Sequence, residues 1–336
     1  MDGKQLGWGL IGASNVARGR MIPAIASDPN SHVAGIVSSD PARARAFAAE
    51  ASIPRVYNDI DELLADPEVD IVYISTTNEQ HKSQALATAR AGKHLLCEKP
   101  LALTLADAKE MVAACSAAGV TMGTNHHLRN AATHRTLRRL IAEGAIGQPL
   151  AVRVFHAIYL PQNLHGWRVN SPHGGGVILD ITVHDADTLR FVLDDEPIEV
   201  TAMTTNQGMA AEGLADGVMG VIRFENSAIA QFHDAFTIRH ASTGFEVHGT
   251  EGSLVGIDIM TQNPKGMIYL QRGDERDVVD YGEMEDLYAR SVRLFNQAVL
   301  TGSQPAATGE DGLRSLAVAL AAAESAATGR TIAVQD

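Results

Sequence analysis

The chain has 336 residues, 45% of them hydrophobic, which is enough for two domains with substantial cores and excludes a largely disordered protein. Its formal net charge of −13 repels nucleic acid and anionic membranes, so we expect neither as a partner. There is no apolar run of ~18 residues and no evident signal peptide, and Cys97 and Cys115 lack a metal-ligand spacing, so we expect a cytoplasmic protein with reduced thiols.

The first predicted elements are a strand over Leu6–Ile11, a turn of small residues and a helix. The turn reads Gly12-Ala13-Ser14-Asn15-Val16. Small residues let a backbone approach a pyrophosphate, and the helix N-terminus supplies N–H donors. The motif is degenerate because Ser14 stands at the second glycine position, so by itself it is also compatible with an ordinary turn.

A second strand is predicted over His32–Val37, and the residues after it bear on the choice of cofactor. Asp40 precedes Pro41, which is typical of a helix N-cap with proline at the first helical position. We therefore interpret Asp40 as a cap and not as the acid that binds a ribose in NAD sites. Ser38 and Arg43 suit a 2′-phosphate, which favours NADP.

The alternation of strands and helices continues and predicts a doubly wound parallel sheet. Its polar strand ends should line one edge, where Asn78, His81 and Asn125 could offer amide or imidazole groups to a nicotinamide ribose, or could serve only as turn and cap residues. The further predicted elements of this half are strands over 69–74, 94–97 and 120–124 and helices over 42–50, 81–91 and 105–118.

The strand over residues 94–97 ends abruptly in Glu98, Lys99 and Pro100. Proline cannot donate a ladder hydrogen bond, so the strand must stop there. Ligands of open α/β sheets bind outside the carboxyl ends of the strands, which places Lys99 beside a cofactor. The alternative is an ordinary surface lysine at a strand end.

After residue 149 the sequence pattern changes, because strand-like runs follow one another with few helices between them. This pattern predicts a largely antiparallel sheet. We expect a first domain over 1–125 and a second over 126–336, with the final helix packing back on the first. The predicted strands are 150–159, 199–205, 218–224, 228–235, 244–248 and 253–257, the helices 133–143, 177–193, 287–300 and 312–327, and a polar loop covers 162–176.

The predicted helix over 177–193 carries Asp180, His184 and Asp187 in an otherwise apolar pattern. Positions four and seven apart share a helix face, so the three either solvate that face or build a site. Hydride transfer to a carbonyl needs a proton at the oxygen, and histidine is the usual donor. His184 is then the candidate donor, Asp180 orients its ring, and Lys99 stabilises negative charge on the oxygen.

Two runs resemble the glucose–fructose oxidoreductase/inositol dehydrogenase (Gfo/Idh/MocA) family: Gly-Lys-His-Leu-Leu-Cys-Glu-Lys-Pro-Leu at 92–101 and Gly-Gly-Gly-Val-Ile-Leu-Asp-Ile-Thr-Val-His-Asp at 174–185. The resemblance spans nearly the whole chain. Further supporting runs lie at 75–81, 123–130, 166–168, 232–236 and 243–254.

The resemblance implies a Rossmann domain, an α+β domain with a large, mostly antiparallel open sheet, and NADPH-dependent reduction of a cyclic keto sugar, 1,5-anhydro-D-fructose to 1,5-anhydro-D-mannitol. It implies that Lys99, Asp180 and His184 form the catalytic group. The implied NADP(H) contacts are Gly12, Ala13, Ser14, Asn15, Val16, Ser38, Ser39, Arg43, Thr76, Thr77, Asn78, His81, Glu98, Lys99, Asn125, Trp167, Arg168 and Tyr288.

Other functions remain open on the sequence alone. Another sugar or inositol dehydrogenase of the same family would use the same machinery with a different pocket. A non-enzymatic NADP-binding sensor would not need a proton relay, so intact Lys99, Asp180 and His184 disfavour it. We expect no metal, because the 13 histidines form no zinc signature such as H-E-x-x-H. Both a monomer and a dimer packed through the sheet are compatible with the sequence.

Overall fold

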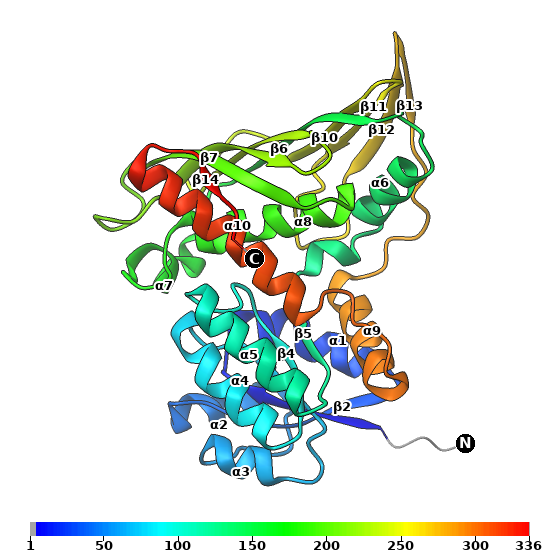
Figure 1. The fold of residues 1–336 in the computed structure, drawn as a ribbon. Coiled ribbons are helices and arrows are strands. Elements are labelled where there is room, and N and C mark those ends of the chain that lie inside the picture. The colour runs from blue at the N-terminus through cyan, green and yellow to red at the C-terminus, as the bar shows by residue number, and fades with distance from the viewer. Residues whose placement is uncertain (1–4, 336) are drawn as a thin grey trace. The chain divides into compact units, whose positions relative to one another are not determined.

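The computed structural model describes residues 5–335, which form two compact units (Figure 1). The first comprises the described residues up to 127 together with 286–313, and the second comprises 128–285 together with 314–335. The predicted single boundary after residue 125 does not include this return of residues 286–313 to the first unit. That return depends on long-range packing, which has no local sequence signal.

The first unit contains a parallel sheet of five strands in the order β2-β1-β3-β4-β5, as expected for a doubly wound fold. Every residue of β1 and β3 is buried, because helices cover both faces of the sheet. The strands are β1 (Leu6–Ile11), β2 (Ser31–Val37), β3 (Ile71–Ile74), β4 (His94–Cys97) and β5 (Met122–Thr124).

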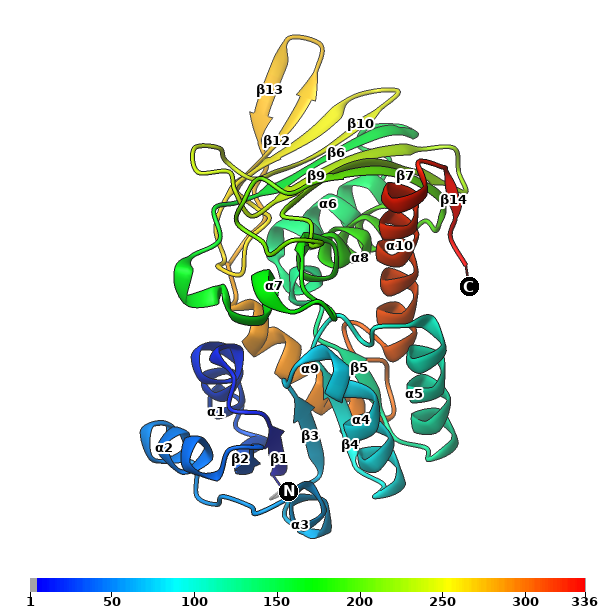
Figure 2. The same cartoon turned by 90° about the vertical axis from the view of Figure 1, so that its left-hand side faces the viewer.

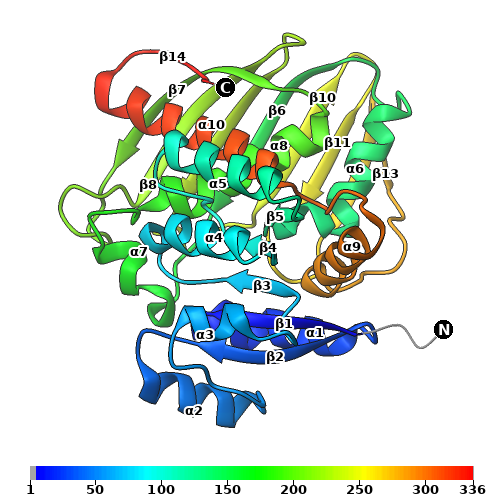
Figure 3. The same cartoon turned by 60° about the horizontal axis from the view of Figure 1, so that its bottom comes forward.

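Two neighbouring residues of β1 show how the helices are divided between the faces. The Trp8 indole donates to Asn296 of α9, whereas a side chain at Gly9 would meet Leu63 of α3. Successive strand residues point to opposite faces, so α9 and α3 cover opposite sides. Figure 3 shows α4 and α5 packed side by side. The helices are η1 (Ala17–Met21), α1 (Ile22–Ser27), α2 (Pro41–Ala51), α3 (Ile60–Ala65), η2 (Asn78–Gln80), α4 (His81–Arg90), α5 (Leu105–Ala117) and α9 (Leu287–Thr301).

The second unit contains a sheet of nine strands in the order β13-β12-β11-β10-β6-β9-β8-β7-β14. Only the β6–β9 pairing is parallel among its described strand pairs, so the sheet is mostly antiparallel, as expected. The strands are β6 (Pro149–Ala157), β7 (Pro197–Thr205), β8 (Gly217–Phe224), β9 (Ile229–Ala235), β10 (Gly244–Gly249), β11 (Ser253–Ile257), β12 (Met267–Arg272), β13 (Glu275–Val278) and β14 (Ile332–Ala333).

The helices of the second unit gather on one face of this sheet, and Figure 2 shows α6, α8 and the C-terminal part of α10 on the same side of the strands. The helices are η3 (His127–Asn130), α6 (Ala132–Ala142), η4 (Gln162–Leu164), α7 (Gly166–Asn170), η5 (Ile178–Thr182), α8 (Val183–Leu193) and α10 (Gly309–Thr328).

Three sequence predictions need correction. The predicted loop over 162–176 contains η4 and α7, which are too short to show a helical period. The predicted helix over 177–193 begins with a π-helical turn, η5, before the α-helical part. The polar strand β13 and its partner β12 were not predicted, because all four residues of β13 are exposed and carry no apolar alternation. Within residues 5–335 no helix combines the length and the apolar character that crossing a membrane would need.

Candidate active site

The five strands of the parallel sheet end in register, which sets a row of polar residues side by side. Ile11 pairs with Val37 and with Ile74, Ile74 pairs with Cys97, and Cys97 pairs with Thr124. The residues that follow these strand ends therefore emerge along one carboxyl edge of the sheet. They are Gly12, Ser38, Ser75, Glu98 and Asn125. This edge is where ligands of doubly wound sheets bind.

The turn after β1 has the geometry that a dinucleotide needs. Gly12 has φ +110°, and a Cβ there would lie 2.9 Å from the Ser75 carbonyl oxygen, so only glycine fits. Ser14, at the degenerate position, donates to the Ser75 hydroxyl at 2.8 Å and accepts from the Ala17 N–H at 3.1 Å. The serine thus closes the turn onto β3, while residues 13–16 are only partly buried.

The end of β2 carries the pair expected to select the cofactor. Arg43 donates from Nη2 to the Ser38 hydroxyl at 3.1 Å, and the arginine is exposed. Asp40 caps α2 by accepting from the N–H groups of Ala42 and Arg43 at 2.9 and 3.1 Å, as predicted. The Arg43 N–H lowers the pKa of Asp40, because it stabilises the carboxylate. With Asp40 engaged at the helix, Ser38 and Arg43 are the groups suited to a phosphate.

The segment after β3 is held mainly by its own hydrogen bonds. Thr76 donates to Gln84 at 2.7 Å, and Thr77 donates to Glu79 at 2.7 Å. His81 is 0% exposed, its Nδ1 lies 3.0 Å from the Pro100 carbonyl oxygen, and burial lowers its pKa. His81 therefore supports the segment after β4 through Pro100, and its assignment as a cofactor contact stays a prediction.

Glu98 is the centre of a buried hydrogen-bond cluster beside Lys99. Its Oε1 accepts from the Tyr73 hydroxyl at 2.6 Å and from the Asn125 amide at 2.7 Å. Burial raises the pKa of Glu98, while these two donors and the Lys99 charge oppose the rise. Tyr73 was not predicted as part of the site, although a tyrosine within a buried strand is itself a sign of a polar partner.

Two predicted cofactor residues lie deep beside this cluster. Asn125 is 1% exposed, and its Oδ1 accepts from the Ser291 hydroxyl at 3.3 Å. Tyr288 is 1% exposed and stacks on His127, with ring centroids 5.2 Å apart. Their assignment as cofactor contacts stays a prediction, and their observed contacts are with the protein.

In the second unit, a short helix and a π-helical turn bring two predicted residues together. Arg168 of α7 donates from Nε to Asp180 Oδ2 of η5 at 2.9 Å, and its guanidinium lies over the Trp167 ring at 4.7 Å. His184 follows in the first turn of α8 and is 6% exposed. π-helical turns are frequent at functional sites, where they redirect a side chain from the regular helix face.

The third residue of the predicted face has a different role. Asp187 is 1% exposed and forms a bidentate ion pair with Arg129, with Nε and Nη2 each 2.8 Å from one of its oxygens. Ser315 of α10 also donates to Asp187 at 3.2 Å. Asp187 therefore anchors α8 in the interior, which is neither the solvated face nor the shared site that the spacing left open.

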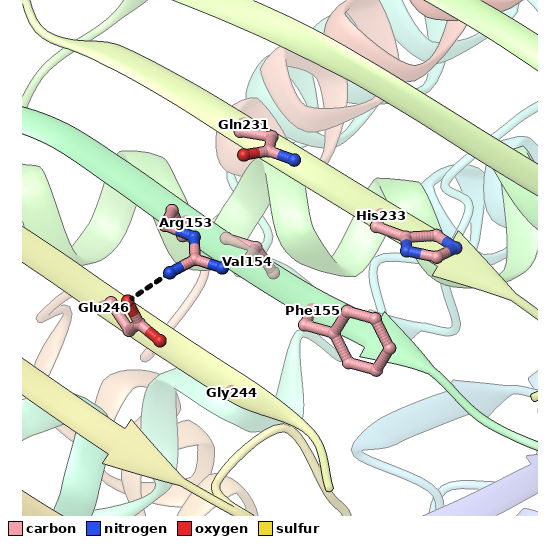
Figure 4. A pocket seen from close by; sticks show the side chains of 7 residues that line it. All are labelled: Arg153, Val154, Phe155, Gln231, His233, Gly244 and Glu246. Carbon is pink, nitrogen blue, oxygen red and sulfur yellow. Dashed lines mark hydrogen bonds and ion pairs between the residues drawn. The ribbon is translucent and has the colours of Figure 1, made fainter. Parts of the chain in front are cut away.

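A hollow of about 250 Å³ lies on the sheet face turned away from the helices (Figure 4). Arg153 and Glu246 form an ion pair of 3.1 Å across it, and Phe155 meets His233 edge to face at 4.9 Å. The remaining lining residues are Val154, Gln231 and Gly244. None of the predicted site residues lines this hollow, so we do not connect it with the reaction. Residues 5–335 contain no group of three or more His, Cys, Asp or Glu side chains that could hold a metal.

Comparison with known proteins identifies the family. Residues 6–126 match the oxidoreductase family with an NAD-binding Rossmann fold, and residues 134–255 match the GFO/IDH/MocA C-terminal domain. The chain is 54% identical over 329 residues to the 1,5-anhydro-D-fructose reductase of Ensifer adhaerens, covering 98% of both chains. The chain belongs to the Gfo/Idh/MocA oxidoreductase family.

Other Gfo/Idh/MocA relatives are more distant. The myo-inositol 2-dehydrogenase of Thermotoga maritima is 29% identical, over 88% of each chain. The solved aldose-aldose oxidoreductase of Caulobacter crescentus, complexed with glycerol, superposes with a TM-score of 0.90 at 26% identity, covering 98% of this chain and 100% of that one. A levoglucosan dehydrogenase solved with NADH and levoglucosan has a TM-score of 0.88 at 24% identity, covering 99% and 100%, and supports the fold alone.

Proposed function

We propose that this Gfo/Idh/MocA protein is an NADPH-dependent reductase of a cyclic keto sugar and converts 1,5-anhydro-D-fructose to 1,5-anhydro-D-mannitol. The observation that carries the proposal is the 54% identity, over 98% of both chains, to a protein named for that substrate. The relatives named for inositol are far less similar, at 29% and 31% identity, and the solved aldose-aldose oxidoreductase is 26% identical. These differences favour the keto sugar over an inositol or an aldose.

The preference for NADPH is supported by the residues after β2. Ser38 replaces the acid that would bind a ribose 2′-hydroxyl, and Arg43 is exposed beside it. Asp40 does not supply that acid, because its carboxylate caps α2. A 2′-phosphate placed here would find a guanidinium, which binds phosphate through charge-assisted hydrogen bonds.

In the proposed reaction, bound NADPH supplies the hydride that reduces the carbonyl carbon of the sugar. His184 donates a proton to the carbonyl oxygen, so that the C=O group becomes CH–OH. Asp180, itself held by Arg168, is the acid that would orient the His184 imidazole. The Lys99 ammonium donates a hydrogen bond to the same oxygen and stabilises the charge that develops there.

A substrate panel tests the proposal. Purified protein is mixed with NADPH or NADH and a keto sugar, or with the oxidised cofactors and aldoses or inositols, and the absorbance of the reduced nicotinamide is followed. We expect turnover with NADPH and 1,5-anhydro-D-fructose and 1,5-anhydro-D-mannitol as the product. Faster oxidation of an aldose or inositol would replace this proposal with a dehydrogenase. Cofactor binding without turnover on any compound would instead favour a sensor.

A further inference from the structure

A single acid of the large sheet holds the chain on both sides of His184. Asp234 of β9 accepts from the Thr182 hydroxyl at 2.6 Å. Its carboxyl group lies beside that of Asp185, because His156, which pairs with Asp234 across β6 and β9, has its Nδ1 2.7 Å from Asp185 Oδ1. Thr182 lies two residues before His184, and Asp185 lies directly after it. The backbone that carries His184 is thereby tied to β9 at two points.

Two neighbouring buried acids, each with an oxygen that lacks a donor, require a proton between them. Asp185 Oδ2 and Asp234 Oδ1 receive no N–H or O–H donor from any residue in the described part of the chain, and both atoms are buried. Two ionised carboxylates are acceptors only and cannot bond to each other. At 1% and 0% exposure, two adjacent negative charges would also lack the solvation that they need.

We propose that Asp185 and Asp234 share one proton, carried by Asp234, and that this acid pair positions His184 for proton donation. The positioning role rests on the proposed function, in which His184 is the proton donor. The shared proton itself does not depend on that function.

The surroundings of the pair determine which acid carries the proton. His156 Nδ1 of β6 lies 2.7 Å from Asp185 Oδ1, so Asp185 can accept on both oxygens as an anion. Asp234 has an oxygen on Thr182 and the other toward Asp185, which suits a donating hydroxyl. Burial raises the pKa of both acids, to about 7 for Asp185 and well above its usual value for Asp234. Burial lowers the pKa of His134 of α6 to about 3, so His134 adds no positive charge to the surroundings of His156.

Asparagine replaces a protonated aspartic acid without changing its shape, which gives a matched pair of variants. In Asp234→Asn the amide NH₂ group can donate to Asp185, and the amide oxygen can still accept from Thr182. In Asp185→Asn the NH₂ group must either face the Asp234 hydroxyl, which is a donor, or face His156 Nδ1, which then has to give up its proton in order to accept. We expect D234N to keep most of the wild-type kcat. We expect D185N to lose on the order of 10- to 100-fold in kcat, with the KM for NADPH unchanged.

The proton is detected independently of turnover by infrared spectroscopy. At neutral pH, the wild-type protein should show the carbonyl band of a buried protonated carboxylic acid, and the wild-type minus D234N difference spectrum should contain it. Urea unfolding and NADPH binding of both variants establish that each has folded. Absence of that band would overturn the shared proton, and equal losses of kcat in D185N and D234N would overturn the positioning role.

Failure of the proposed function can be distinguished from failure of the shared proton. If the band is present but a His184→Ala variant turns over at the wild-type rate, the positioning role is overturned together with the assignment of His184 as donor. The infrared result then stands by itself as evidence for the shared proton.

Discussion

Replacing Arg43 with alanine is expected to weaken NADPH selectively. The guanidinium is exposed and touches the Ser38 hydroxyl at 3.1 Å, so its removal leaves the fold of α2 intact. A hydrogen bond to a charged group contributes about 1.5–3 kcal/mol, and solvent exposure places this one at the lower end. Since 1.4 kcal/mol is a factor of ten, we expect the KM for NADPH to rise about tenfold. The KM for NADH should change little, because NADH carries no 2′-phosphate.

The assay is steady-state reduction of 1,5-anhydro-D-fructose with each cofactor. Arg45→Ala is the matched control, since Arg45 is an exposed arginine of the same helix and removes the same charge from the surface. A general electrostatic effect would appear in both variants, whereas a contact with the 2′-phosphate appears only in R43A. Equal increases in KM for NADPH and NADH, or equal effects of R43A and R45A, would refute the reasoning.

Three further expectations can be checked together. A His184→Ala variant should lose turnover while its affinity for NADPH, measured by fluorescence titration, is unchanged. An Asp187→Ala variant should lower the free energy of unfolding in urea by about 3–5 kcal/mol, because it leaves Arg129 as an uncompensated buried charge, whereas Glu143→Ala at an exposed pair should cost about 0.5 kcal/mol. The Asp234 proton is retained in the native state and released on unfolding. The free energy of unfolding of the wild type, measured relative to that of D234N, should therefore fall from pH 4 toward pH 7 by up to about 1.4 kcal/mol per pH unit.

Each of these has a distinct contrary result. Normal turnover of H184A would remove that side chain from the proton-transfer step. A D187A variant as stable as E143A would mean that the Arg129 ion pair contributes nothing net. For the pH series, the sign is decisive: a raised native pKa stabilises the fold at low pH, so stability that rises with pH relative to D234N would contradict protonation of Asp234.

The first unit could be predicted well because its signals are local. Apolar runs that end in small or polar residues, alternating with helical segments, indicate β1, β3 and β4 and the parallel sheet that they form. The cap at Asp40 followed from two adjacent residues. The strand ends were predicted to share one edge, and the register of the sheet puts them there.

The second unit was harder because its polar residues find partners far along the chain. Arg129 and Asp187 are 58 residues apart, and Thr182 and Asp234 are 52 apart, so neither spacing signals an interaction. A lone acid in the apolar strand around Asp234 was the available signal, since a buried carboxyl group needs a partner.

The sequence by itself determined the alternation of strands and helices in the first unit, the turn of small residues at Gly12 and the residue types at positions 99 and 184. Only the tertiary structure decided which of the acids near His184 is an anchor, which is held by an arginine, and which requires a proton. The reason is physical. Secondary structure depends on residues a few positions apart, whereas the charge state of a buried acid depends on burial and on donors that other elements bring to it.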